Sequence, residues 1–417
     1  MGADMRQRWI IVGHGMVAMR LLREIVALRP EQVQLVCIGE EALPGYSRIG
    51  LSDVLAGKRD IDSLQDVATD WYERHDIQSL HGRVVTIDRP RKRVTLADGN
   101  ILHYDRLLLA TGSAPRLPDV PGIDLPQVRP FRTVEDVCSL LAVAPGSRAV
   151  VLGGGLLGLE AAVGLAGRGV EVTLVHREGW LMNRQLDRQA GDWLEEALAQ
   201  RGVRFLKNTE AAAIEPEGAA CRVDLVSGER LPADVVVPAI GIVPRVDLAR
   251  DAGLEVGRGV VVNDWLQTSD AAICALGECA EHRGTGYGLV APLYEQARVL
   301  ARQLVTGQGS YTGSAVSTQL KVSGVPVFSA GAVEAEDPND LIVWRDEAHR
   351  EYRKLILRNN RLVGAVLFGD VRDGQFYQDL IERQVDVSTV RQTLVFGAAF
   401  CTELPAQKIE IPEQVAA

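Results

Sequence analysis

Two glycine-rich turns, each set between an apolar strand and a helix, constrain this chain more than any other feature. The first lies in WIIVGHGMVA at residues 9–18, and the second lies in AVVLGGGLLGLE at residues 149–160. Glycine at such turns lets the backbone N–H groups of a helix N-terminus reach a phosphate, because no Cβ intervenes. One turn of this kind is a weak signal. Two of them in one chain predict a protein that holds two nucleotides at once.

The two turns predict matching roles for their residues. Gly13 makes the tight turn, Gly15 lets a pyrophosphate approach, and Ala18 keeps the helix close to the strand. Gly153, Gly155 and Gly158 repeat these roles in the second turn. The residues that open the two helices are expected beside the nucleotides as well; they are Met16, Val17, Leu156 and Leu157.

The strands that follow the two turns end in different residues. The first ends in Glu40, whose carboxylate can accept hydrogen bonds from a ribose, although it stands further from Gly13 than the roughly 20 residues usual for the motif. The second ends in VHRE and places His176 where an NAD-binding strand usually has an acid. Arg177 can pair with the 2′-phosphate of NADPH; a solvated surface charge is an equal alternative. Glu178 can serve a 2′-hydroxyl, so the sequence leaves NADH or NADPH open.

The order of apolar strands and amphipathic helices predicts an α/β chain with two Rossmann-like domains. The strand TSDAAICALGE returns to the first domain only after the second is complete, which predicts that the second is inserted in the first. From about residue 318 the pattern changes to a β-meander with an Asn-Asn turn, followed by a helix around QFYQDLIERQV. That change indicates a separate C-terminal α+β domain.

Charge and composition exclude several classes of function. The net charge of −10 argues against non-specific nucleic-acid binding. No apolar run reaches the 18 residues of a membrane span, and the N-terminus runs directly into the first strand, so we expect no signal peptide, no membrane association and a cytoplasmic location. The six cysteines and seven histidines lack metal-ligand spacing. No metal is therefore expected.

With these pieces in order, the chain resembles flavoproteins of the pyridine-nucleotide-disulfide-oxidoreductase type. More narrowly, it is similar to the N-terminal part of the assimilatory nitrite reductase large subunit and to the stand-alone flavoprotein subunits of assimilatory nitrate reductase. The motifs that carry the likeness are GHGMVA, PGYSRIGLS, YDRLLLATGS, RTVEDV, GGGLLGLEAA, LMNRQLD, GIVPRVDLA, TSDAAICALGECAEHRG, YGLVAPLYEQA and STQLKVSGVPVFSAG.

The resemblance implies the domains and their cofactors. An FAD-binding domain would comprise residues 1–121 and 245–317, an NADH- or NADPH-binding domain residues 122–244, and a C-terminal α+β interface domain residues 318–417. Gly13, Gly15 and Glu40 would hold the adenosine half of FAD. Thr111 and Gly112 would form the turn that closes on it.

Further site residues follow from the same motifs. Gly277 and Glu278 would lie at the FAD ribityl or pyrophosphate region, where the wider family has Asp in place of Glu278; helix capping is the alternative for Glu278. Arg48 would approach the flavin, with a surface salt bridge an equal alternative. Gly241 is expected among the cofactor-binding residues, with His176 and Arg177. Glu160 would lie near the nicotinamide as a catalytic residue, unless it is an ordinary helix-face carboxylate, and Lys321 would stabilise anionic flavin.

Two absences shape the expected chemistry. PGYSRIGLSDVL contains no cysteine, and Asp53 stands where many ferredoxin reductases have lysine. We therefore expect hydride transfer from nicotinamide to flavin without a dithiol relay. Because the chain also lacks the iron–sulfur cysteines of full-length nitrite reductase, we expect it to pass electrons to a partner protein, foremost an assimilatory nitrate or nitrite reductase.

Other readings stay open at this point. A reductase for rubredoxin or ferredoxin would have the same fold, and a flavin-bearing redox sensor or interaction protein with little turnover would need no acceptor. An oxidase acting on oxygen or peroxide is disfavoured, because it usually carries a cysteine near the flavin. Six basic residues between Arg345 and Arg361 could steer an acidic electron carrier, or form an ordinary solvated sheet face.

Overall fold

The computed structural model describes residues 6–402 and Leu404, apart from Glu31, Thr69, Ala315, Val316 and Ser323, and gives only the backbone of residues 317–322. The described chain divides into two compact units. The first comprises the residues up to Arg177 together with Arg201–Ser314, and the second comprises Glu178–Gln200 together with the residues after Ser314.

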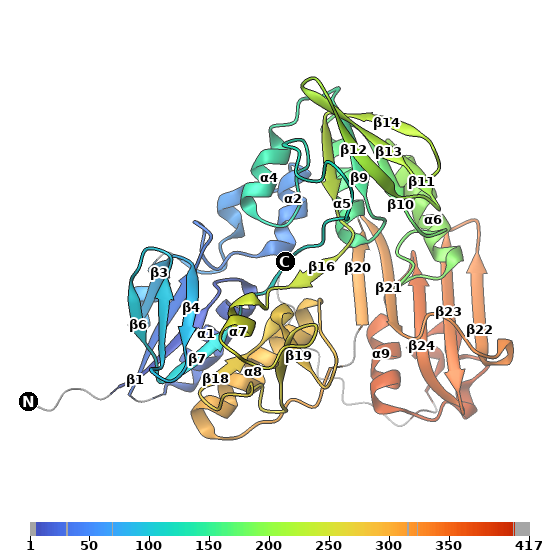
Figure 1. The fold of residues 1–417 in the computed structure, drawn as a ribbon. Helices are drawn as coiled ribbons and strands as arrows, with labels where there is room; N and C mark the ends of the chain where they lie inside the picture. Colours follow the sequence, from blue (N-terminus) through green and yellow to red (C-terminus); the bar gives the residue numbers. More distant parts are fainter. Residues whose placement is uncertain are drawn as a thin grey trace, which may run out of the picture. The chain divides into compact units, whose positions relative to one another are not determined.

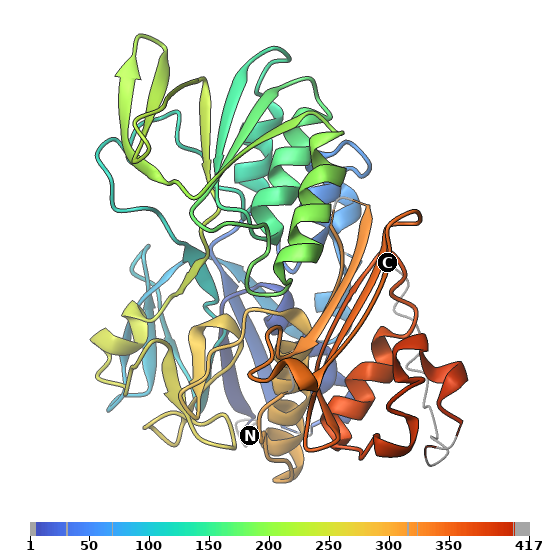
Figure 2. The same ribbon diagram turned by 90° about the vertical axis from the view of Figure 1, so that its right-hand side faces the viewer.

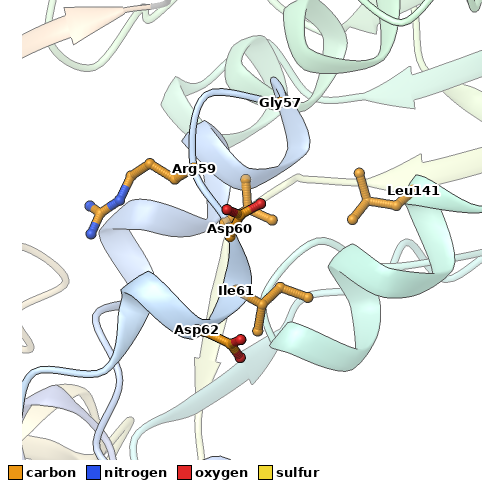
Figure 3. A pocket seen from close by; sticks show the side chains of 7 residues that line it. Gly57, Arg59, Asp60, Ile61, Asp62 and Leu141 are labelled. Atoms are coloured by element: carbon orange, nitrogen blue, oxygen red, sulfur yellow. The ribbon is translucent and has the colours of Figure 1, made fainter. Parts of the chain in front are cut away.

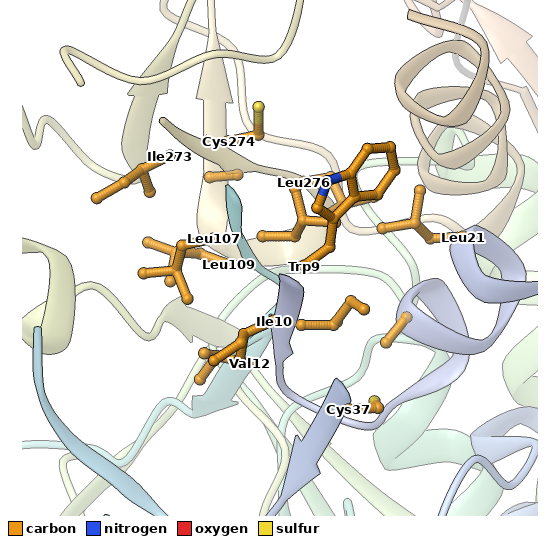
Figure 4. Packing of buried hydrophobic residues seen from close by; sticks show 14 of the residues in the cluster. Trp9, Ile10, Val12, Leu21, Cys37, Leu107, Leu109, Ile273, Cys274 and Leu276 are labelled. Atoms are coloured by element: carbon orange, nitrogen blue, oxygen red, sulfur yellow. The ribbon is translucent and has the colours of Figure 1, made fainter. Parts of the chain in front are cut away.

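A parallel five-stranded sheet organises the N-terminal part of the first unit (Figure 1). Its strands, in spatial order, are β18 (Ile273–Ala275), β7 (Arg106–Leu109), β1 (Gln7–Val12), β2 (Val33–Gly39) and β3 (Ile77–His81). These strands read as continuous apolar runs because parallel strands are covered on both faces. Trp9, Leu107 and Cys274 belong to the buried core around them (Figure 4). Helices α1 (Met16–Leu28) and α8 (Val290–Thr306) pack against each other.

A second parallel sheet follows in the chain and completes before β18 returns to the first. Its order is β11 (Val203–Lys207), β10 (Glu171–His176), β9 (Arg148–Leu152) and β15 (Val235–Pro238), with α5 (Leu156–Ala166) after β9. An antiparallel sheet of β12 (Ala211–Glu217), β13 (Ala220–Leu225) and β14 (Arg230–Ala233) joins it. The predicted insertion of one Rossmann-like domain in another is thus confirmed.

Two short strands carry the chain from the first sheet to the second and back. β8 (Ser113–Pro115) leaves, β16 (Ile242–Pro244) returns, and the two pair antiparallel. The other strands of this unit are β4 (Val84–Asp88), β5 (Arg93–Leu96), β6 (Ile101–His103), β17 (Val260–Val262) and β19 (Ala280–His282). Its other helices are α2 (Leu51–Leu55), α3 (Trp71–Arg74), α4 (Val134–Leu141) and α7 (Asp247–Asp251), with 3-10 turns η1 (Arg48–Gly50), η2 (Ile61–Leu64) and η3 (Gly277–Cys279).

The second unit is built on an antiparallel sheet (Figure 2). Its order is β20 (Ser317–Val322), β21 (Val325–Gly331), β24 (Arg361–Phe368), β23 (Glu351–Arg358) and β22 (Leu341–Asp346). The turn between β23 and β24 uses Asn359 and Asn360, both with positive φ, as a tight hairpin demands. Strands β22, β23 and β24 therefore form the predicted meander, and β21 and β20 extend the sheet beyond β24. The 3-10 turns here are η4 (Pro338–Asp340), η5 (Ser388–Val390), η6 (Leu394–Phe396) and η7 (Ala398–Phe400).

Helices cover both faces of this antiparallel sheet. α9 (Gly374–Arg383) packs against β21 and β24, where Leu355 and Leu367 contribute to one buried cluster. α6 (Arg188–Ala199) places Trp193 against Tyr352 and Phe368, which point to the opposite face because side chains alternate along a strand. The helix at residues 188–199 thus packs with the C-terminal residues, although the sequence assigned it to the NAD(P)-binding domain. The predicted domain boundaries stay a prediction.

None of the helices in the described part of the chain combines the length and apolar composition that a membrane crossing needs.

Candidate functional site

The first glycine of each turn stands where only glycine fits. Gly13 has φ +107°, and a Cβ on it would lie 2.1 Å from the carbonyl oxygen of Ala110. Gly153 has φ +116°, and its Cβ would lie 2.4 Å from the carbonyl oxygen of Ala239. Each glycine therefore lets the turn pass close to the end of a neighbouring segment, and the two turns share one construction.

The second glycine of each turn faces open space. Gly15 and Gly155 are the N-cap residues of α1 and α5, with extended backbone and without a capping side chain among the described residues. A Cβ on either would meet no atom of the described chain within 4 Å. The N–H groups of a first helical turn have no partner within the helix, so the first-turn N–H groups of both helices face space that a pyrophosphate would fill. Met16, Val17, Leu156 and Leu157 form these first turns.

The third position of each turn holds helix and strand together. Ala18 is buried in the core of the first unit. Gly158 is more constrained, because a Cβ there would lie 2.0 Å from the carbonyl oxygen of Gly153. Both turns therefore fit a dinucleotide, with one glycine for the turn, one for the ligand and a small residue for packing.

Glu40 follows β2 at the same edge of the first sheet. Its carboxylate forms an ion pair with Arg245, and both side chains are about half exposed. Arg245 donates its N–H to the carbonyl of Gly112 at 2.9 Å, and the Thr111 hydroxyl donates to the Arg245 carbonyl at 2.9 Å. The structure thus brings the predicted residues Glu40, Thr111 and Gly112 together around an arginine that the sequence analysis missed.

Glu278 lies in a second polar cluster of the first unit. Its carboxylate accepts a hydrogen bond from the Ser113 hydroxyl at 2.6 Å and pairs with Arg132. Arg132 also donates to the Ser113 carbonyl at 2.9 Å. Gly277 has φ +86° and donates its N–H to the buried Gln296 side chain of α8 at 2.9 Å. The sequence analysis missed Arg132 as a partner of Glu278, although Arg132 is the first residue of the RTVEDV motif and that motif could have indicated it.

Arg48 is part of a compact cluster rather than an isolated surface charge. It forms an ion pair with Glu41, while its guanidinium lies 5.5 Å from the ring centroid of Tyr46. The Tyr46 hydroxyl donates to the same carboxylate at 2.6 Å. Burial raises the pKa of Tyr46 well above its usual range. The cluster holds the segment before α2 in place.

Glu160 lies where α5 contacts α2. Its carboxylate accepts a hydrogen bond from the Ser52 hydroxyl, and one turn further along Leu55 packs over Gly164, where a Cβ would come within 3.0 Å of Leu55. Burial raises the pKa of the Glu160 carboxyl; the negative charge of Asp53 adds to this and the Ser52 hydrogen bond opposes it. Glu160 is therefore a partly buried acid whose pKa is raised, with Ser52 as a partner that the sequence analysis missed.

At the end of β10, His176 turns toward the second glycine turn. It is 9% exposed, and its Nδ1 accepts the N–H of Gly154 at 3.1 Å. Arg177 follows it at the end of the first unit's segment. Gly241 has φ +122°, and a Cβ there would meet nothing within 4 Å among the described residues. Open space thus lies at Gly155 and Gly241 alike.

Two further predictions concern the C-terminal residues. The side chain of Lys321, on β20, lies outside the described part of the chain. The basic stretch has its charges paired: Arg353 and Lys354 are buried against carboxylates, and exposed Arg345, Arg350 and Arg358 each pair with a glutamate. Arg361 donates to the carbonyl of Gln384. An unneutralised basic patch is therefore not what these residues form.

A pocket of about 310 Å³ is lined by residues of α2, of the segment that follows α2, and of α4 (Figure 3). Its lining includes Asp60 and Asp62 from the segment after α2 and Leu141 from α4, while the Arg59 side chain points away from Leu141 in this view. None of its lining residues belongs to the predicted sites, and we assign it no function.

Comparison with known proteins agrees with this geometry. Residues 7–303 match the pyridine nucleotide-disulphide oxidoreductase family, and residues 317–385 match the rubredoxin NAD+ reductase C-terminal domain. The chain is 39% identical to the assimilatory nitrate reductase electron transfer subunit of Bacillus subtilis (strain 168), over 94% of this chain and 51% of that protein. It is 42% identical to a nitrite reductase [NAD(P)H] of the same organism, over 92% of this chain and 48% of that protein.

Among solved structures, the chain is similar to the covalent putidaredoxin reductase–putidaredoxin complex. The TM-score is 0.84 at 27% identity, and the match covers 95% of this chain and 99% of that one. The chain spans about half the length of the two Bacillus subtilis relatives.

Proposed function

Because the chain belongs to the pyridine nucleotide-disulphide oxidoreductase family, we propose that it takes electrons from NADH or NADPH through a bound FAD and passes them to a partner redox protein. The observation that carries the proposal is the pair of glycine turns, Gly13–Gly15 and Gly153–Gly155, each with an uncapped helix start and open space in front. Two such turns within one compact unit fit two dinucleotides.

The residues divide between the two nucleotides as follows. At the FAD, Gly15 would admit the pyrophosphate to the start of α1, and Glu40 would accept a ribose hydroxyl. Glu278, held by Arg132 and Ser113, would face the ribityl region. When bound, FAD supplies the step from two-electron donation by a nicotinamide to one-electron transfer. At the nicotinamide nucleotide, Gly155 would admit the pyrophosphate.

Glu160 supports the same proposal as a catalytic residue. Its carboxyl is partly buried, its pKa is raised by burial, and Ser52 orients one of its oxygens. A partly buried carboxyl with a raised pKa, oriented by a hydrogen bond, is a common form of general acid or base. The Thr111–Gly112 turn and Arg48 would complete the flavin surroundings.

The proposed acceptor is an assimilatory nitrate or nitrite reductase, because the two Bacillus subtilis relatives carry those names. A reductase for rubredoxin or a ferredoxin is the second candidate. It is favoured by the match of residues 317–385 and by the likeness to putidaredoxin reductase. We place the activity in the cytoplasm, since all six cysteines are free thiols, as is usual in reducing compartments.

The test is an anaerobic titration of the purified, FAD-loaded protein with NADH and with NADPH, following the visible absorbance of the flavin. Bleaching at one nucleotide per flavin is the expected result. Reduced protein is then mixed with the catalytic subunit of an assimilatory nitrate reductase, with nitrite reductase, with rubredoxin and with ferredoxin. If flavin binds but neither nucleotide bleaches it, electron transfer is wrong and a redox-sensor role takes its place.

A further inference from the structure

Arg245 is held by its backbone at the edge of the proposed FAD site. It follows β16, and its N–H donates to the Gly112 carbonyl at 2.9 Å while its own carbonyl accepts from the Thr111 hydroxyl at 2.9 Å. Both partners belong to the turn that follows β7. The chain's return from the second sheet is thereby tied to the first sheet at this residue.

The Arg245 side chain reaches the one carboxylate that is expected to hold the FAD ribose. Its Nη1 pairs with Oε1 of Glu40, a residue 205 positions earlier in the chain. Within the described residues, the other oxygen of Glu40, Oε2, has no hydrogen-bond partner. One oxygen is therefore held by the protein, and the other is available to a hydroxyl group.

The ion pair between Arg245 and Glu40 matters for the charge that a bound pyrophosphate would bring. A pyrophosphate at the start of α1 would bring negative charge to the edge of the sheet where the Glu40 carboxylate lies, and these like charges would repel each other. His14, which lies within the first glycine turn, does not offset this repulsion, because burial lowers its pKa to about 4 and its ring is neutral at physiological pH. The first turn of α1, Met16–Met19, carries no charged residue either. Arg245 is the cation bonded to the carboxylate.

We propose that Arg245 is a positioning residue for the adenosine half of FAD, acting through Glu40. It holds Oε1 so that Oε2 meets a ribose hydroxyl, and it offsets the repulsion between this carboxylate and the pyrophosphate. The inference rests on the proposed function, because it presupposes FAD at the Gly13–Gly15 turn. The opposite arrangement, in which Arg245 competes with the ribose for Glu40, makes the opposite prediction for its removal.

The experiment measures FAD affinity of the full-length apo-protein, by the change in flavin fluorescence on binding, for the unmodified chain and for Arg245→Ala, Glu40→Gln and the double variant. Charged hydrogen bonds of this kind predict a loss of roughly ten- to a hundredfold for Arg245→Ala. In the Glu40→Gln background the same change should cost little, because a carboxamide needs no neutralisation. Arg245→Lys, which keeps the charge but not the fork of donors, should fall in between.

Arg250→Ala is the matched control, since Arg250 is an exposed arginine that pairs with Asp247 within α7; FAD affinity should stay unchanged. Tighter FAD binding by Arg245→Ala would overturn the proposal in favour of competition. An equal loss of FAD affinity on Arg245→Ala in the unmodified and in the Glu40→Gln background would overturn it too, because Arg245 would then not act through that carboxylate. If Arg245→Ala does not fold, Arg245→Lys in the two backgrounds decides by the same comparison. Failure of the unmodified apo-protein to bind FAD would instead remove the proposed function itself.

Discussion

A single methyl group at Gly155 tests whether the second glycine turn carries a pyrophosphate. Gly155 caps α5 with φ −84° and ψ 177°, a conformation open to alanine. A Cβ there would meet no described atom within 4 Å, so Gly155→Ala should leave the packing intact and lose only the capping preference of glycine, about 1 kcal/mol or less.

The same methyl group would stand in the space proposed for the pyrophosphate. Crowding by one methyl group costs roughly 1–3 kcal/mol, which corresponds to an affinity loss of about 5- to 150-fold. The expected result is weaker binding of NAD+ and NADP+ at an unchanged flavin content. Isothermal titration calorimetry of the FAD-loaded protein measures the affinity, and urea unfolding measures the stability.

Two matched variants distinguish a loss of ligand binding from a loss of protein stability. Gly158→Ala would put a Cβ 2.0 Å from the Gly153 carbonyl oxygen, so it should lower the free energy of unfolding by about 1–3 kcal/mol or more. Gly15→Ala should weaken FAD rather than the nicotinamide nucleotide. Normal NAD(P)+ affinity in Gly155→Ala would refute the assignment of this turn, and instability equal to that of Gly158→Ala would refute the open-space geometry.

Three further predictions concern charged groups. Burial raises the pKa of the Glu160 carboxyl in the folded state, so this group stabilises the fold at low pH and loses that contribution as the pH rises above the ordinary value of 4.5. Urea unfolding over a range of pH should therefore show Glu160→Gln gaining stability relative to the unmodified protein as the pH rises. Parallel pH profiles of the two proteins would contradict this. Arg353→Ala should lower the free energy of unfolding by about 1.5–3 kcal/mol, because it removes the ion pairs to Asp370 and Asp373 and the hydrogen bond to the Val395 carbonyl, while Arg372 still pairs with Asp370. A loss under about 1 kcal/mol in the same assay would show that these contacts of Arg353 are unimportant. The His176→Asp variant should bind NADP+ less tightly than the His176→Asn variant. Either new side chain can accept the Gly154 N–H as His176 does, but only aspartate repels a 2′-phosphate. Equal Kd values for NADP+ would place that phosphate elsewhere.

Local features of the fold were predictable because their causes are local. The two glycine turns follow from steric limits within a few residues, and the structure gives Gly13 and Gly153 the same left-handed conformation. The Asn359–Asn360 hairpin turn follows from the tolerance of asparagine for positive φ. The insertion of one Rossmann-like domain in another follows from the order of apolar strands along the chain.

The polar partners of the site's carboxylates were not predictable from the sequence. Glu40 meets Arg245 across 205 positions, Glu278 meets Arg132 across 146, and Glu160 meets Ser52 across 108. Such pairs form where the crossover strands β8 and β16 and the packing of α2 on α5 bring distant segments together. Their spacing in the sequence carries no periodic signal.

The sequence by itself determined the fold class, the two nucleotide-type turns and the meander, because backbone sterics and hydrophobic periodicity act over short stretches. Tertiary structure alone decided which charges are buried or paired. Arg353 and Lys354 read as surface residues in an alternating strand, yet both are buried, because helices cover both faces of their sheet. A buried charge needs a partner, and only the folded chain supplies Asp370 for Arg353 and Asp187 for Lys354.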